Sequence, residues 1–134
     1  DVIGTLTPGS EGSTFGGYPL ASVVAVYAIK VLEEEKLAKN ARIRGAQLLQ
    51  HFDDLKNEFP DKIKEIRGKG LLTAFEMYNH KHLDGHIISM ELMNKGVYAK
   101  ETHHSTVRIA PALTIESWQI DDLAESIRDV VKEL

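Results

Sequence analysis

Residues 63–77 read IKEIRGKGLLTAFEM, and this stretch decides how the second half of the chain folds. Two short runs typical of strands, 63–67 with two isoleucines and the largely apolar 71–77, lie on either side of the segment Gly68-Lys69-Gly70. Runs of this kind joined by a glycine-rich connection are typical of an antiparallel β-hairpin. We therefore expect a small sheet here, with the other elements arranged around it.

Helices are predicted on both sides of this hairpin. Apolar residues recur at helical spacing over about 40–59 and 116–134, and Pro60 ends the first of these helices. Residues 87–94 predict a shorter helix that Gly96 closes, and 97–100 and 106–110 predict two more strands. With a helix from Pro19 onward, the order is α-α-β-β-α-β-β-α. This order predicts an α/β protein, of the α+β kind in this piece, with a small, mostly antiparallel sheet that helices cover on one face.

The N-terminal part of the chain has a different character. Residues 1–17 contain Pro8 and many Gly, Ser and Thr residues, which indicates irregular structure. A long helix is expected from Pro19, and residues 20–29 are almost entirely apolar, as in a helix that is buried on every side. Apolar surface of this extent is rare on a soluble monomer. We therefore expect this helix to pack against other protein.

Composition excludes several classes of protein. The 134 residues include 16 Lys and Arg and 20 Asp and Glu, a formal net charge of −4, which argues against a polybasic nucleic-acid binder. The absence of cysteine excludes a disulfide framework, a thiolate metal site and a cysteine nucleophile. The apolar stretch 20–29 is about half of the ~20 residues that span a bilayer. Because the chain begins at Asp1 rather than Met, we expect either a processed terminus or a piece of a longer protein.

Residues 12–19, Gly-Ser-Thr-Phe-Gly-Gly-Tyr-Pro, carry the first candidate site. The hydroxyls of Ser13 and Thr14, the open backbone N–H groups of the glycines and a helix N-terminus together favour a phosphate or a carboxylate. The same composition also fits a flexible loop with a helix cap. The segment lacks the Gly-Lys-Ser/Thr of a Walker loop. Composition alone leaves both interpretations open.

Arg108 is the second candidate. It lies within the apolar strand segment 107–110, so its guanidinium is expected to be half-buried and to need an anionic partner. A structural Asp or Glu would serve, and so would the carboxylate of a substrate. These two interpretations are close to even.

The remaining polar residues predict no further chemistry. His80 and His82 flank a lysine, and His103 and His104 are adjacent, so neither pair has metal-ligand spacing and no metal site is predicted. No Ser–His–Asp arrangement and no carboxylate pair can be argued from spacing. We therefore predict no catalytic residue in this chain.

Three segments, in order along the chain, resemble one family. Residues 12–21 (GSTFGGYPLA), 67–72 (RGKGLL) and 108–113 (RIAPAL) are similar to segments of the class III, fold-type-I pyridoxal-phosphate aminotransferases. Residues 100–103 (KETH) ahead of the third segment look like the ornithine aminotransferases within that family, whereas acetylornithine aminotransferases share only the Arg-x-x-Pro-x-Leu core. Two residues depart from the family pattern: Tyr18 stands where Asn is usual, and Glu11 where His is common.

This resemblance implies roles for the candidate residues. Ser13 and Thr14 would bind the phosphate of the pyridoxal 5'-phosphate of the neighbouring subunit, and Arg108 would bind a substrate carboxylate. Residues 1–39 would be a phosphate-loop segment and connecting helix that belong against a missing large domain, and 40–134 a C-terminal small domain. In this family the Schiff-base lysine lies upstream of the matching segments. The chain alone is therefore expected to be inactive and to bind the cofactor weakly or not at all.

Two hypotheses for function follow. In the first, the chain is the C-terminal portion of an ornithine aminotransferase that transfers the terminal amine of ornithine to 2-oxoglutarate. Its partners would be the large domain, a homodimer mate and small amino-acid and 2-oxo-acid substrates, without nucleic acid or membrane, in the cytoplasm or, in a eukaryote, the mitochondrial matrix. In the second, the chain is a stand-alone, non-catalytic dimerisation or partner-binding module; a fragment of an acetylornithine-type enzyme is a further alternative. The reading frame upstream of Asp1 would separate the two.

Overall fold

The computed structural model describes residues 3–7, 9–78 and 84–134. The chain divides into two compact units, Asp1–Lys36 and Leu37–Leu134, each defined by its own internal contacts. The boundary that the sequence suggests, after residue 39, falls within the first turn of the second helix, which spans Leu37–Glu58. That residues 1–39 belong against a large domain stays a prediction.

The first unit consists of a short 3-10 helix, η1 (Ile3–Thr5), an irregular segment and the long helix α1 (Pro19–Glu34). Pro19 occupies the first helical turn, where its missing N–H costs no hydrogen bond. No residue of α1 is buried, and the side chains of Val24 and Tyr27 are 59% and 63% exposed. The helix thus forms where the sequence predicts it. The burial expected for its apolar residues stays a prediction, because nothing in the described chain covers them.

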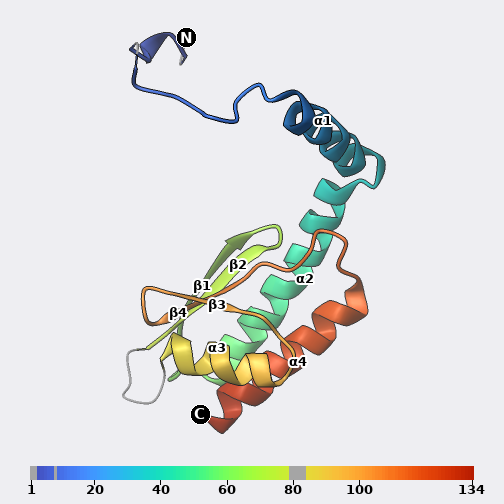
Figure 1. Ribbon diagram of the computed structural model, residues 1–134. Helices are drawn as coiled ribbons and strands as arrows, with labels where there is room; N and C mark the ends of the chain where they lie inside the picture. The colour runs from blue at the N-terminus through green and yellow to red at the C-terminus, as the bar shows by residue number, and fades with distance from the viewer. Residues whose placement is uncertain (1–2, 8, 79–83) are drawn as a thin grey trace. The chain divides into compact units, whose positions relative to one another are not determined.

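The second unit alternates helices and strands: α2 (Leu37–Glu58), β1 (Ile63–Lys69), β2 (Leu72–Met77), α3 (Gly85–Asn94), β3 (Lys100–Thr102), β4 (Thr106–Ile109) and α4 (Ser117–Glu133). The strands form a four-stranded sheet in the order β1-β2-β4-β3, and each neighbouring pair is antiparallel. The three helices pack on the sheet and on one another (Figure 1). The predicted fold class, a small antiparallel sheet with helices on one face, is confirmed.

Side chains alternate between the two faces of the sheet, as strand geometry requires. In β2, Phe75 and Met77 are buried, whereas Glu76 between them lies toward the opposite face. Phe75 packs edge-to-face on Phe52 of α2, with the ring centroids 5.5 Å apart. The core cluster continues through the residues Leu48, Leu55, Ile63, Leu71, Ile88, Leu92, Ala99, Val107, Ile109, Ile120, Ile127, Val130 and Val131. The core therefore lies on the face of the sheet that the helices cover, and the opposite face is not part of it.

Helix α2 approaches the β1–β2 turn so closely that only glycine fits between them. A Cβ atom built on Gly45 would lie 2.1 Å from the carbonyl oxygen of Gly70 and 2.6 Å from its Cα, far inside van der Waals contact. Gly70 itself has φ +58°, a conformation that glycine adopts without strain. The two glycines therefore fix the distance between the helix and the hairpin.

One predicted strand lies in a different place. Residues 97–100 were expected to be a strand, but β3 spans Lys100–Thr102. The N–H of Val97 donates to the carbonyl of Leu92 and that of Gly96 to the carbonyl of Met93, which closes α3 in a Schellman motif with φ +81° at Gly96. Since the backbone of Val97 completes the helix end, the strand begins only after it.

Candidate functional site

The face of the sheet that the helices leave uncovered carries a row of cations. Register pairs Arg67 of β1 with Ala74 of β2, Ala74 with Arg108 of β4, and Arg108 with Lys100 of β3. Residues that are paired across antiparallel strands point to the same face. Arg67, Arg108 and Lys100 therefore lie in one line across the sheet, with the small side chain of Ala74 between the two arginines.

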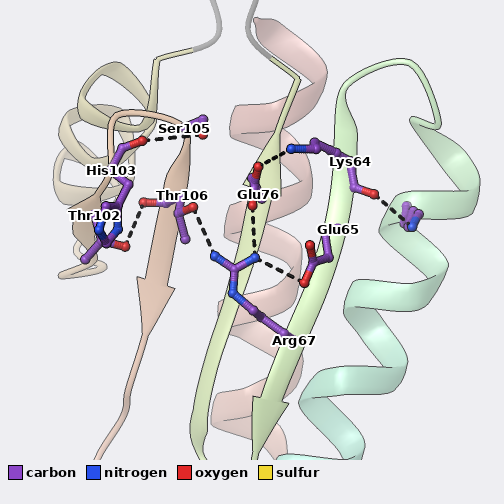
Figure 2. Close-up of polar contacts among 9 residues, drawn as sticks. Lys64, Glu65, Arg67, Glu76, Thr102, His103, Ser105 and Thr106 are labelled. Atoms are coloured by element: carbon purple, nitrogen blue, oxygen red, sulfur yellow. Dashed lines mark hydrogen bonds and ion pairs between the residues drawn. The ribbon is translucent and has the colours of Figure 1, made fainter.

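The neighbouring row is polar and partly acidic, and it fixes Arg67 (Figure 2). Register pairs Glu65 of β1 with Glu76 of β2, and Glu76 with Thr106 of β4. The Nη1 of Arg67 donates to Glu76 Oε2 at 3.0 Å and lies 3.3 Å from Glu65 Oε1. Its Nη2 donates to Thr106 Oγ1 at 3.3 Å. Three partners on three strands thus hold one guanidinium.

Lys64 completes this network from the bulged start of β1. The register shifts between Ile63 and Glu65, and such a bulge turns an extra side chain onto the exposed surface. The Nζ of Lys64 then donates to Glu76 Oε1 at 2.6 Å, so each oxygen of Glu76 has its own cation. The side chain of Glu76 is only 17% exposed, the least exposed of the charged groups here.

The electrostatics of the network follow from this geometry. The hydrogen bonds from Lys64 first, and from Arg67 second, hold the pKa of the Glu76 carboxyl below its usual range. In return, the hydrogen bond to Glu76 raises the pKa of Lys64 and that of Arg67. Arg67 therefore stays fixed and largely neutralised by its acids wherever Glu76 is ionised.

The effect of Glu76 on stability is expected to depend on pH. Its pKa is lower in the folded than in the unfolded chain, so its ion pairs stabilise the fold above the ordinary carboxyl pKa near 4.5 and lose this effect as the pH falls. Glu76→Gln should therefore show a smaller loss of Tm than the parent chain between about pH 6 and pH 3. Glu125→Gln, on the exposed surface of α4, is the control and should keep the parental slope. Equal slopes for both variants and the parent would contradict a special role for Glu76.

A hollow of about 360 Å³ lies between the two arginines, on the uncovered face of the sheet. Its lining consists of Arg67, Gly68, Lys69, Leu72, Thr73, Ala74 and Arg108. Unlike that of Arg67, the side chains of Arg108 and Lys69 make no hydrogen bond or ion pair with any described residue. The hollow is therefore lined by three cations. Arg67 is paired with Glu65 and Glu76, whereas the charges of Arg108 and Lys69 have no counter-ion among the described residues.

The expectation that Arg108 is half-buried is wrong. Its side chain is exposed, while Val107 and Ile109 on either side of it are buried against the helices. Strand alternation sends Arg108 to the uncovered face, so apolar neighbours in sequence are not neighbours in space. An acid partner for it is absent from the described ranges. The sequence left two partners possible for Arg108, a structural acid or a substrate carboxylate. The described residues do not support a structural acid.

The other candidate residues lie in the first unit. Ser13 and Thr14 are exposed, and within residues 3–7, 9–78 and 84–134 their hydroxyls make no hydrogen bond. The N–H of Gly16 donates to the carbonyl of Ser13 at 3.4 Å, and Gly17 has φ +76°, so the segment turns immediately before α1. The N-terminus of α1 has no side-chain cap. Two free hydroxyls beside an uncapped helix start are the donors that a phosphate requires.

The candidate residues belong to two different units of the chain. Ser13 and Thr14 belong to the unit Asp1–Lys36, and Arg108 belongs to Leu37–Leu134. Among the described residues, no group of three His, Asp or Glu side chains is arranged to hold a metal ion. His80 and His82 lie outside the described residues. No helix in the described ranges has both the length and the apolarity to cross a membrane.

The acid side of the site was missed by the sequence analysis. Glu76 and Lys64 are far from Arg108 in sequence, and only the strand register places Glu76 beside the strand that carries Arg108. The available signal was the alternation in β2, which sends Ala74 and Glu76 to the face opposite Phe75. Pairing this alternation with that of residues 63–67 would have placed Arg67 beside Glu76.

The sequence and the fold agree with one family of enzymes. The sequence profile of the family described as Aminotransferase class-III matches residues 1–131, and the chain belongs to this family. It is 41% identical over 135 residues to the mitochondrial ornithine aminotransferase of Arabidopsis thaliana and 42% identical over 131 residues to the ornithine aminotransferase of Staphylococcus carnosus. These alignments include 98% and 97% of this chain.

Solved structures give the same result. Ornithine delta-aminotransferase from Plasmodium falciparum superposes with a TM-score of 0.83 at 40% identity, over 98% of this chain and 33% of that one. Acetylornithine aminotransferase from Elizabethkingia anophelis superposes with a TM-score of 0.84 at 33% identity, over 99% of this chain and 33% of that one. The chain spans 28% and 31% of the two curated relatives named above. It thus corresponds to about a third of the proteins that it resembles.

Proposed function

We propose that this chain is the C-terminal portion of an ornithine aminotransferase, an enzyme that transfers the terminal amine of ornithine to 2-oxoglutarate. The supporting observation from the structure is the exposed guanidinium of Arg108, which faces a hollow and has no internal counter-ion among the described residues. A guanidinium favours a carboxylate, because its planar fork donates two parallel hydrogen bonds. The identities of about 40% to ornithine aminotransferases support the same donor.

Class III aminotransferases use pyridoxal 5'-phosphate, which supplies the electron sink for amino transfer when it is bound. The residues of this chain fit its phosphate end, because the hydroxyls of Ser13 and Thr14 are unengaged and lie beside the uncapped start of α1. By the family resemblance, these hydroxyls would hold the phosphate in the site of a neighbouring subunit. The chain would contribute binding groups and no catalytic residue, and we propose that it is inactive alone.

The proposal also assigns partners to the exposed helix α1. Its apolar side chains would be covered by the large domain and the mate of a homodimer. The small-molecule substrates would then bind between Arg108 of this chain and the parts that this chain does not supply. Relatives include enzymes named as mitochondrial, so we propose the mitochondrial matrix in a eukaryote and the cytoplasm otherwise.

The second candidate is an acetylornithine-type aminotransferase. It is favoured by the TM-score of 0.84 to the Elizabethkingia anophelis enzyme, which is within a hundredth of the 0.83 to the Plasmodium falciparum enzyme described above. The backbone therefore does not discriminate between the two donors. The difference in identity, 40% against 33%, favours ornithine.

The amino donor is tested on the intact protein, encoded by the continuous reading frame that includes this chain. We expect amino transfer to 2-oxoglutarate with a kcat/KM that is at least about tenfold higher for ornithine than for N-acetylornithine. Acetylation removes the positive charge of one amine, and a site that recognises this charge distinguishes the two donors by a few kcal/mol. A preference for N-acetylornithine would establish the second candidate. An intact protein that binds pyridoxal phosphate and uses neither donor would contradict both.

A further inference from the structure

Glu76 is an acid that lies diagonally opposite Arg108 on the uncovered face of the sheet. Register pairs Glu76 with Thr106 of β4, and Arg108 follows Thr106 by two residues on the same face. Such diagonal neighbours have backbones about 7–8 Å apart, a distance that long side chains span. Among the described residues, Glu76 nevertheless pairs with Lys64 and Arg67 and not with Arg108. Another feature of this face therefore keeps the two apart.

The guanidinium of Arg67 fills the space between Glu76 and the strand β4. Its side chain starts on β1, opposite Ala74, and extends over β2. Its Nη1 donates to Glu76 Oε2 at 3.0 Å, and its Nη2 donates to Thr106 Oγ1 at 3.3 Å (Figure 2). Thr106 is only 3% exposed, although strand alternation places it on the uncovered face. Arg67 therefore bridges the gap that Arg108 would have to cross in order to reach Glu76.

Both oxygens of Glu76 are engaged in this arrangement. Lys64 Nζ donates to Oε1 at 2.6 Å, and Arg67 donates to Oε2. The side chain of Glu76 is 17% exposed, which leaves little space for a third cation. The positive charge of Arg67 also repels a second guanidinium that approaches the same oxygen. Arg108 is thus left to face the hollow without a counter-ion among the described residues.

We propose that Arg67 is a positioning residue of the carboxylate site. By holding Glu76, it prevents an internal ion pair between Glu76 and Arg108, and it leaves the guanidinium of Arg108 free for a substrate. Arg67 acts through Glu76 and not by contact with the substrate. This inference rests on the carboxylate role that the proposed function gives to Arg108. It adds the reason why a nearby acid does not occupy that arginine.

The first test measures the kinetics of the intact protein with Arg67→Met, which removes the charge and keeps an extended side chain. Without Arg67, Glu76 Oε2 is open to Arg108, so that 2-oxoglutarate has to displace an internal ion pair. We expect kcat/KM for 2-oxoglutarate to fall about tenfold, which corresponds to competition with one charge-assisted contact. The value for ornithine reports the other half of a two-step transfer and should change less than about twofold.

The double variant Arg67→Met/Glu76→Gln distinguishes positioning from a general effect on the fold. A neutral amide does not form an ion pair with Arg108, so kcat/KM for 2-oxoglutarate should return to within about threefold of the parent value. If the double variant stayed as impaired as Arg67→Met, Arg67 would act through the fold or by direct contact with the substrate, and the proposal would be overturned. An unchanged kcat/KM in Arg67→Met would overturn it as well.

Arg128→Met is the matched control. The side chain of Arg128 on α4 is 43% exposed, against 45% for Arg67, and it pairs with Glu58 at 3.0 Å. Its replacement removes a comparable ion pair from a helix that packs on the other face of the sheet. We expect both kcat/KM values to stay within about twofold of the parent. A loss equal to that of Arg67→Met would reduce the effect to net charge or stability and contradict the proposal.

An NMR titration of the Glu76 carboxyl in the 134-residue chain tests the same competition without cofactor or turnover. In Arg67→Met, Arg108 should become a counter-ion of Glu76, so the pKa of Glu76 should stay below its usual range. In Arg67→Met/Arg108→Met, this second cation is also absent, and the pKa of Glu76 should be higher than in Arg67→Met. Equal pKa values in the two variants would show that Arg108 does not reach Glu76, and the proposal would be wrong.

The two measurements separate this inference from the proposed function. If the intact protein transfers the amine of ornithine but Glu76→Gln does not rescue Arg67→Met, the role of Arg67 is wrong and the function stands. If the intact protein has no such activity while the titration shows that Arg108 replaces Arg67 at Glu76, the function is wrong and the competition for Glu76 stands.

Discussion

Gly45→Ala is expected to lower the free energy of unfolding by about 3 kcal/mol, at the upper end of the usual effect of overpacking. In an exposed helix interior the same change stabilises by about 1 kcal/mol, because alanine has the higher helix propensity. Here the added methyl group would lie 2.1 Å from the carbonyl oxygen of Gly70. That atom belongs to the backbone of the β1–β2 turn, so the clash is relieved only if α2 and the hairpin move apart.

Chemical denaturation of the 134-residue chain measures this effect. Ala46→Gly is the control, because Ala46 is the next residue of α2 and is exposed. It should lower the free energy of unfolding by about 1 kcal/mol or less, from helix propensity alone. If Gly45→Ala instead raised the midpoint of unfolding, the close approach of α2 to the turn would be wrong.

Arg108→Ala in the intact protein is expected to raise the KM for 2-oxoglutarate about 10- to 100-fold, since a hydrogen bond to a charged group contributes about 1.5–3 kcal/mol and 1.4 kcal/mol is tenfold. The thermal stability should change little. Arg108 is exposed and lacks an acid partner in the described part of the chain, so its removal strands no buried charge there. A structural arginine would show the opposite pattern, with a loss of about 3–5 kcal/mol of stability.

Arg108→Lys is the sharper variant, because it keeps the charge and removes the planar fork. We expect it to keep the stability of the parent protein and to recover the affinity for 2-oxoglutarate only in part. Steady-state kinetics with 2-oxoglutarate, together with thermal melts of the same preparations, distinguish the two roles. Normal KM in Arg108→Lys, or unfolding of Arg108→Ala, would contradict the carboxylate role.

The order and type of the elements could be predicted from the sequence, because each depends on local patterns. The apolar run after Pro19 predicted the helix α1, and the glycines at 68 and 70 predicted the hairpin of β1 and β2. The start of β3 could not be predicted, since apolar residues at 97 and 99 fit a strand equally well. Only the hydrogen bond from Val97 to Leu92 shows that this backbone closes a helix.

Some residues of the candidate site could be identified from the sequence and others could not, for a physical reason. Arg108 was recognised because a cation in an apolar strand is unusual, yet its exposure depends on which face the helices cover. The pair of Arg67 and Glu76 depends on register, which is a property of two strands and not of either sequence alone. Likewise, nothing near Gly45 in sequence indicates that Gly70 lies against it.

The strand order β1-β2-β4-β3 has a consequence for synthesis on the ribosome. The hairpin of β1 and β2 is complete when Met77 has emerged, but its central partner β4 ends at Ile109. At about 5–20 residues per second, this interval lasts roughly 2–6 s. During that time β2 presents the free hydrogen-bonding edge with which β4 later pairs. The nascent chain therefore passes through a period in which pairing with another copy competes with its own completion.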